Sequence, residues 1–158
     1  MIRDATPADL DAIAAVTRAA FREGSAEKAV RIVREVEPEV TIVWEEDGHI
    51  LGHTMLSRMR MGEHRPFQLS PVSVHPDHQR RGIGSAIVRE ALRRADEIGE
   101  PFVVLLGHPS YYPRFGFEPA TPLGVLAPGE FGDAWMLARL SSYDPSVTGR
   151  VEFPPQFD

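Results

Sequence analysis

The feature that most constrains this chain is an apolar strand that runs into a basic, glycine-bearing turn and then into a long amphipathic helix. The strand ends at Val74, the turn carries Gly82, and the helix extends from about Gly84 to Ile98. Backbone N–H groups at a helix start have no intrahelical partner, and the helix dipole favours an anion there. The stretch 71–85 therefore predicts a turn that binds phosphate.

The segments around this stretch alternate between strand and helix patterns. Residues 102–106 are five apolar residues in a row, which is typical of a central parallel strand covered on both faces. We expect an α+β fold with α/β/α layers, in which a mixed, mostly antiparallel sheet of about six or seven strands contains one parallel βαβ unit. The strands are expected at Ile2, 40–45, 49–61, 67–74, 102–106, from 117, 134–140 and 151–153.

Two helices are expected before the strand at 40–45. Thr6 is suited to cap the first of them, with Pro7 at its first position. Gly24 is expected to break this helix and Ser25 to cap the second, which Pro38 closes.

Proline at position 71 lies inside a predicted strand. Because proline cannot donate to a ladder, Pro71 predicts a sheet edge or a β-bulge. A bulge leaves backbone groups of Val72 and Val74 unpaired, and buried unpaired groups are costly. Either an extended ligand with amide groups pairs there like an added strand, or the segment is an ordinary edge strand wetted by solvent.

Length, charge and cysteine content bound the class of protein. A chain of 158 residues is about one domain, and we expect residues 1–158 to form a single one. No apolar run approaches the roughly 18 residues of a membrane span, and the N-terminus shows no charged-then-apolar leader. We therefore expect a cytoplasmic protein with no membrane partner. The net charge of −6 argues against a nucleic-acid partner, and the absence of cysteine excludes disulfides and thiolate metal sites.

Basic residues concentrate between residues 58 and 81. That stretch holds five arginines and three histidines against two acidic residues. It indicates either a small polyanionic ligand or chance clustering on a solvated hairpin. His75 and His78 have a spacing seen at metal sites, but no third ligand is near them in the sequence, and we expect no metal.

Two motifs, taken in order, resemble the GNAT family of N-acetyltransferases. Residues 79–84 resemble its acyl-CoA-binding signature, Gln/Arg-x-x-Gly-x-Gly/Ala, and residues 112–117 resemble its later Tyr-x-x-aliphatic/aromatic-Gly-Phe element. The resemblance runs from Ile2 to about Leu140. It implies the acyl-CoA N-acyltransferase fold, acetyl-CoA as cosubstrate, and acetyl transfer to a primary amine of a small molecule or peptide by direct attack. Many members of the family are dimers, so a homodimer is possible.

The resemblance also implies a role for individual residues. Tyr112 would donate a proton to the departing CoA thiolate, and the backbone N–H of Val72 or Ser73 would stabilise the oxyanion. Arg80 or Arg81 would contact phosphate. The residues implied to bind the cofactor are Val72, Ser73, Val74, Gln79, Arg80, Arg81, Gly82, Ile83, Gly84 and Ser85.

The general base departs from the family pattern. Many members carry a glutamate on the strand before this turn, where this chain has Gln68 and Ser70. His53 on the neighbouring strand is the tentative base, with a purely structural histidine or a chain of waters as alternatives. His108, which follows the strand at 102–106, is a further residue that could touch cofactor or substrate.

The resemblance places the acceptor near residues 21–25. An acidic lining from Glu23 or Glu27 would suit a cationic amine.

Two other classes of function compete with this interpretation. A non-catalytic acyl-CoA-binding or sensor domain is the main alternative, because the strand glutamate is missing. A dinucleotide- or nucleotide-binding domain is disfavoured, since the turn lacks both the third glycine of a Rossmann motif and the lysine of a Walker loop.

Overall fold

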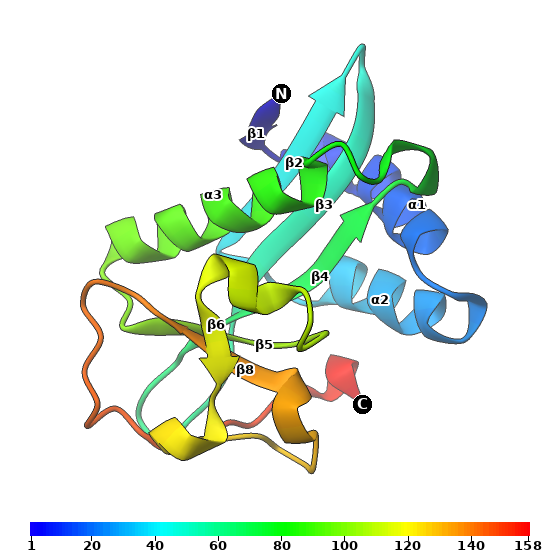
Figure 1. The fold of residues 1–158 in the computed structure, drawn as a ribbon. Helices are drawn as coiled ribbons and strands as arrows, with labels where there is room; N and C mark the ends of the chain where they lie inside the picture. The colour runs from blue at the N-terminus through cyan, green and yellow to red at the C-terminus, as the bar shows by residue number, and fades with distance from the viewer.

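The central element of the fold is a seven-stranded sheet with helices on both faces (Figure 1). The computed structural model describes residues 1–158, and its strand order is β1-β2-β3-β4-β5-β8-β6. The strands are β1 (Ile2–Asp4), β2 (Val40–Glu46), β3 (His49–Arg58), β4 (Phe67–Val74), β5 (Phe102–Leu106), β6 (Phe117–Pro119) and β8 (Trp135–Arg139), with β7 (Val125–Leu126) and β9 (Gly149–Arg150) in a small second sheet. The helices are α1 (Leu10–Ala20), α2 (Glu23–Glu35) and α3 (Ile83–Ile98).

The expected α+β architecture is confirmed. Strands β4 and β5 are parallel and joined by α3, and every other pair in the large sheet is antiparallel. Helix α3 buries Ile87, Val88 and Ala91 against one face of the sheet, while α1 and α2 cover the other face. Gly99 ends α3 in a left-handed conformation with φ of 96°, as a C-terminal glycine commonly does. None of the helices is long and apolar enough to cross a lipid bilayer.

Three element boundaries differ from those expected. Strand β3 ends at Arg58 instead of residue 61, because the two residues beyond Met59 make isolated bridges elsewhere. The last strand lies at 149–150, paired with β7, and not at 151–153. Helix α2 begins at Glu23, so Gly24 lies inside its first turn, and the Ser25 hydroxyl donates to the Arg22 carbonyl oxygen at 3.2 Å.

Strand β4 bends away from β5 at the predicted bulge. Leu69 faces Leu56 and Val72 faces Thr54, so two residues of β4, including Pro71, are accommodated opposite one residue of β3. Pairing with β5 is confined to the first two residues of β4. The two central strands therefore separate toward their carboxyl ends, and this separation opens the groove described below.

Candidate active site

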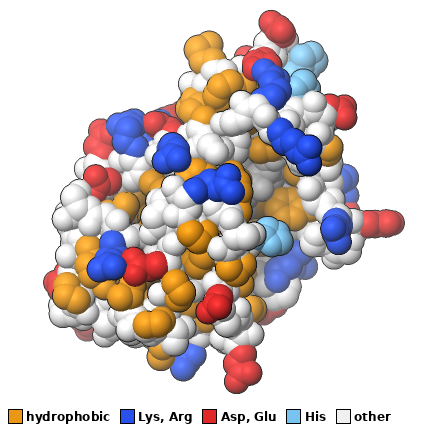
Figure 2. Space-filling view, in the orientation of Figure 1, with side chains coloured by type: hydrophobic (Ala, Val, Ile, Leu, Met, Phe, Trp, Pro, Cys, Tyr) orange, Lys and Arg blue, Asp and Glu red, His pale blue; other side chains and the backbone are white.

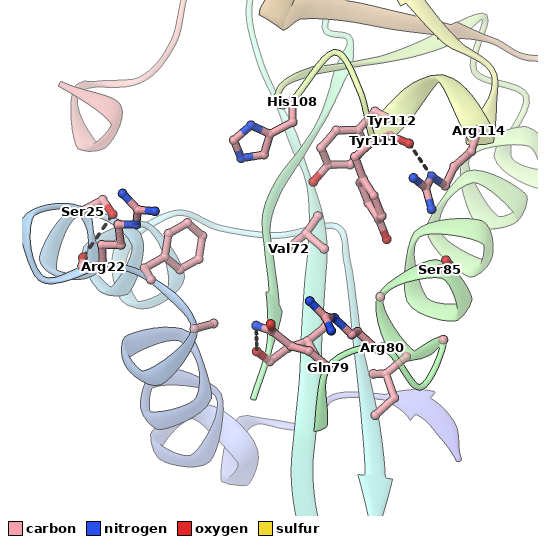
Figure 3. Close-up of a pocket in the computed structure, with 16 residues that line it drawn as sticks. Arg22, Ser25, Val72, Gln79, Arg80, Ser85, His108, Tyr111, Tyr112 and Arg114 are labelled. Atoms are coloured by element: carbon pink, nitrogen blue, oxygen red, sulfur yellow. Dashed lines mark hydrogen bonds between the residues drawn. The ribbon is translucent and has the colours of Figure 1, made fainter. Parts of the chain in front are cut away.

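A large cavity lies where β4 and β5 separate (Figure 3). It has a volume of about 990 Å³ and is open to solvent. We call it the groove. Its lining residues are Ala20, Phe21, Arg22, Ser25, Val72, Val74, Gln79, Arg80, Gly82, Ile83, Gly84, Ser85, His108, Tyr111, Tyr112 and Arg114.

The start of α3 gives one end of the groove a set of free backbone donors. Gly82 is the N-cap residue, with φ of 81°, and as a glycine it has no side chain that could cap the helix. The Ala86 N–H donates the first intrahelical hydrogen bond, to the Gly82 carbonyl oxygen. The N–H groups of residues 83–85 lie before it and have no acceptor within the helix. No acidic residue occupies the first turn of α3. This end of the groove is built to receive an anion.

Close approach at this end depends on Gly84. A Cβ atom at that position would lie 3.2 Å from the Tyr111 hydroxyl and 3.5 Å from a methyl of Val74. The glycine therefore lets β4, α3 and Tyr111 meet beside the free N–H groups.

The two arginines of the turn point to different places. Arg81 donates to the Glu46 carboxylate at 2.6 Å and contacts His78 at 2.9 Å, and it does not line the groove. Arg80, with φ of 65°, lines the groove and has no carboxylate partner. Of the two arginines implied by the resemblance, the structure brings only Arg80 to the groove. Arg81 instead ties the turn to the end of β2.

The open edge of β4 presents unpaired backbone groups to the groove. His75 donates its N–H to the Leu51 carbonyl oxygen at 2.8 Å, and the β3–β4 register is regular from there to Val72. In an antiparallel ladder the backbone N–H and C=O groups of successive residues point to opposite edges of the strand. Those of Ser73 therefore point toward β3, and those of Val72 and Val74 point toward the edge from which β5 has diverged. The expected unpaired groups are thus present at the two valines. Ser73 does not line the groove, and its side chain is fully buried.

One of these open carbonyl groups meets a side chain of the turn. The Gln79 amide nitrogen lies 3.5 Å from the Val74 carbonyl oxygen. This contact links the end of β4 to the glycine turn. It also places Gln79 in the groove, as expected.

The Tyr112 side chain extends into the groove on the side of Val72 and His108 (Figure 3). Its ring packs on Gly107, where a Cβ atom would lie 2.3 Å from the ring. Burial, with a smaller contribution from Tyr111, raises the pKa of Tyr112 to about 12. Tyr112 is therefore a neutral phenol at pH 7 and can donate a hydrogen bond.

The tentative base, His53, is not brought to the groove. It lies on the face of β3 covered by α1 and α2, and it lines a separate cavity of about 390 Å³ that shares no residue with the groove. Its Nε2 is 3.1 Å from the Thr41 hydroxyl, and its Nδ1 is buried without a partner. Burial lowers the pKa of His53 to about 4. The alternation of β3 explains this placement, because the side chains of His53 and of Thr54, which pairs with Val72, point to opposite faces of the sheet.

Two arginines that line the groove were not singled out from the sequence alone. Arg22 comes from the turn before α2, and Arg114 comes from the segment after β5, as does Tyr111, which the sequence suggested only as a packing residue. The only available signal for Arg114 is its position inside the Tyr112–Phe117 motif. Neither Glu23 nor Glu27 lines the groove, and Glu27 pairs with Arg18, so the expected acidic lining is absent.

Comparison with known proteins identifies a family. Residues 1–120 match the family model described as an acetyltransferase (GNAT) domain. The chain is 30% identical over 166 residues to the uncharacterized N-acetyltransferase YhbS of Escherichia coli strain K12, covering 100% of this chain and 98% of that protein.

Two solved structures share the fold over nearly the full length. The E. coli YhbS structure in complex with CoA has a TM-score of 0.87 at 28% identity, covering 99% of this chain and 91% of that one. A GNAT family acetyltransferase from Brucella melitensis in complex with acetyl-CoA has a TM-score of 0.79 at 30% identity, covering 100% and 97%. The family model, the sequence identity and the shared fold agree, and this chain belongs to the GNAT family of acetyltransferases.

Proposed function

We propose that this protein transfers the acetyl group of acetyl-CoA to a primary amine, with residues 1–158 acting as one domain. The observation that carries the proposal is the alignment of three features along the groove. Free N–H groups at the start of α3 are followed by the open backbone of Val72 and Val74, and then by the buried phenol of Tyr112. A long ligand with phosphates at one end and amides along its arm matches this order.

The cofactor is held mainly by backbone in this proposal. The pyrophosphate accepts hydrogen bonds from the N–H groups of residues 83–85, and Arg80 adds a charge-assisted contact. The amides of the pantetheine arm pair with Val72 and Val74, as an added strand does. The bound CoA of E. coli YhbS and the acetyl-CoA of the Brucella protein support this assignment by similarity.

The reaction is a direct attack of a neutral amine on the thioester carbonyl. The nitrogen–carbon bond forms first and gives a tetrahedral oxyanion, which the Val72 N–H stabilises. The carbon–sulfur bond then breaks as Tyr112 donates its proton to the leaving sulfur. The amine nitrogen loses one proton, so that the products are the acetamide and the CoA thiol, and Tyr112 regains its proton from solvent.

We propose that His108 accepts the proton that the amine loses. It is the one imidazole among the groove residues, whereas His53 lines a different cavity. No aspartate or glutamate lines the groove to serve as a carboxylate base. An exchange with water relays the proton from His108 to solvent.

Replacing Tyr112 with phenylalanine tests the proposal against a non-catalytic acyl-CoA sensor. We expect Tyr112→Phe to lower turnover about 10²-fold, the lower end of what general acid catalysis contributes, while the Kd for CoA stays within about twofold. Turnover is measured as CoA thiol released in the presence of a panel of amines, and Kd by calorimetry. A protein that binds CoA but acetylates no amine would support the sensor, and a protein that does not bind acetyl-CoA would refute both.

A further inference from the structure

The groove concentrates arginines that have no carboxylate partner. Eight of the sixteen arginines in the chain form ion pairs with aspartate or glutamate. None of these eight lines the groove, whereas the three arginines that do line it, Arg22, Arg80 and Arg114, are unpaired. In a chain with a net charge of −6, this selection indicates that the groove receives anionic groups.

The three arginines divide between the two ends of the groove. Arg80 stands at the start of α3, beside the proposed pyrophosphate site. Arg114 lies over the Tyr111 ring, 4.4 Å from its centre, and donates to the Tyr111 carbonyl oxygen at 2.8 Å. Both lie on the α3 side of the groove in Figure 3. The proposed pyrophosphate contact accounts for Arg80, and Arg114 is engaged by Tyr111.

Arg22 lies across the groove from α3, away from the proposed phosphate site (Figure 3). It precedes α2, and its side chain is exposed and makes no hydrogen bond or ion pair within the chain. Ser25, one turn further on, lines the same side of the groove, but its hydroxyl donates to the Arg22 carbonyl oxygen. His108 lines the groove from the segment after β5.

The acidic residues nearest Arg22 in the sequence do not enter the groove. Glu27 is engaged by Arg18, and Glu23 lies outside the groove. In Figure 2 basic side chains border the hollowed part of this face, and most acidic side chains lie toward its edges. The acceptor end of the groove is thus positive, and a polycationic amine would meet repulsion there.

We propose that the acceptor is a small primary amine that itself carries a carboxylate, which the Arg22 guanidinium binds while the amine faces Tyr112. This inference rests on the proposed acetyl transfer and names its substrate class. Arg22 serves as the specificity residue, since a guanidinium binds a carboxylate through two parallel hydrogen bonds. An ammonium group in the same position finds no acceptor carboxylate in the groove.

Three CoA conjugates test whether the groove prefers a carboxylate-bearing acceptor, and the test does not require turnover. Each carries a –CH2–C(O)–NH–R group on the CoA sulfur, where R is 2-carboxyethyl, propyl or 2-aminoethyl. We expect the carboxyethyl conjugate to bind at least about tenfold more tightly than the propyl conjugate, and the aminoethyl conjugate to bind most weakly. Binding is measured by calorimetry on the full chain.

The variant Arg22→Gln and its control Lys28→Gln test whether Arg22 causes the tighter binding of the carboxyethyl conjugate. Lys28 is an exposed cation on α2, the helix that Arg22 precedes, and it lies outside the groove. We expect Arg22→Gln to reduce the carboxyethyl preference to within about twofold and to leave the Kd of CoA unchanged, while Lys28→Gln retains the preference. Thermal melting checks that both variants are folded.

The outcomes distinguish failure of the proposed acetyl transfer from failure of the carboxylate assignment. If CoA itself does not bind, the proposed acetyl transfer is wrong and this inference falls with it. If CoA binds but the carboxyethyl conjugate shows no advantage, or if Arg22→Gln leaves the advantage intact, acetyl transfer stands and the carboxylate assignment is overturned. Tighter binding of the aminoethyl conjugate would point to a cationic acceptor and equally overturn it.

Discussion

Replacing Gly107 with alanine should displace the Tyr112 ring without touching its hydroxyl. A Cβ atom at Gly107 would lie 2.3 and 2.6 Å from two ring carbons of Tyr112, where ordinary contacts begin at about 3.4 Å. The Gly107 N–H is held by the Ala134 carbonyl oxygen at 3.0 Å, so the ring gives way more easily than the backbone. Its φ is not in the left-handed region, and alanine brings no backbone strain of its own.

The displacement sets the size of the expected effects. Removing the overlap requires the Tyr112 ring to move by about 1 Å, and a misplacement of that size can lower a rate about 10²-fold. Overpacking lowers the free energy of unfolding by about 1–3 kcal/mol. Replacing glycine with alanine also reduces the conformational entropy of the unfolded chain, which raises the free energy of unfolding by about 0.4–1 kcal/mol. We therefore expect Gly107→Ala to lose about 10²-fold in turnover and about 1–2 kcal/mol in stability, with CoA affinity nearly unchanged.

A mutant cycle with Tyr112→Ala distinguishes displacement of the ring from general damage. Without the ring, Gly107→Ala has only the flexible end of the Leu105 side chain to accommodate, and its stability cost should fall to about zero. Turnover is followed by CoA thiol release, and stability by urea unfolding. The reasoning is refuted if Gly107→Ala keeps turnover within threefold of the wild type, or if its stability cost persists when the ring is absent.

Two further predictions concern the turn before α3 and the buried histidine. Arg80→Gln should weaken CoA binding about tenfold and Arg81→Gln less than threefold, because only Arg80 faces the groove, and equal losses in calorimetry would contradict this division. For His53, the folded pKa of about 4 lies below the unfolded value of 6.5, so only the unfolded chain takes up this proton as the pH falls from 6.5 to 4. Stability should therefore fall across that window, by about 3 kcal/mol at its lower end, and urea unfolding of His53→Gln should show a flatter pH dependence than the wild type or the control His49→Gln.

The cofactor end of the site could be predicted because its signals are contiguous in the chain. The strand that ends at Val74, the turn with Gly82 and the amphipathic face of α3 are all local patterns, and each fixes a conformation by itself. Pro71 likewise predicts a break in pairing wherever its strand packs, since proline cannot donate to a ladder. The five consecutive apolar residues of β5 then predicted a central strand with a parallel neighbour.

The placement of single side chains depended on contacts between distant segments. Alternation along β3 predicts that His53 shares a face with Leu51, but only the packing of α1 and α2 decides which face that is. Arg81 is turned from the groove by Glu46, 35 residues earlier in the chain.

The amino-acid sequence by itself thus determined the strand, the glycine turn, the helix and the Tyr112 motif, because local sterics and hydrophobic periodicity specify them. Only the tertiary structure decided which charges meet. Most of the basic stretch at 58–81 lies outside the groove, and Arg58, for example, is engaged by Glu39 and Glu100. Arg22 is brought to the groove from the α1–α2 turn. The physical reason is that the pairing of charges depends on distance in space, and the packing of helices on the sheet sets that distance.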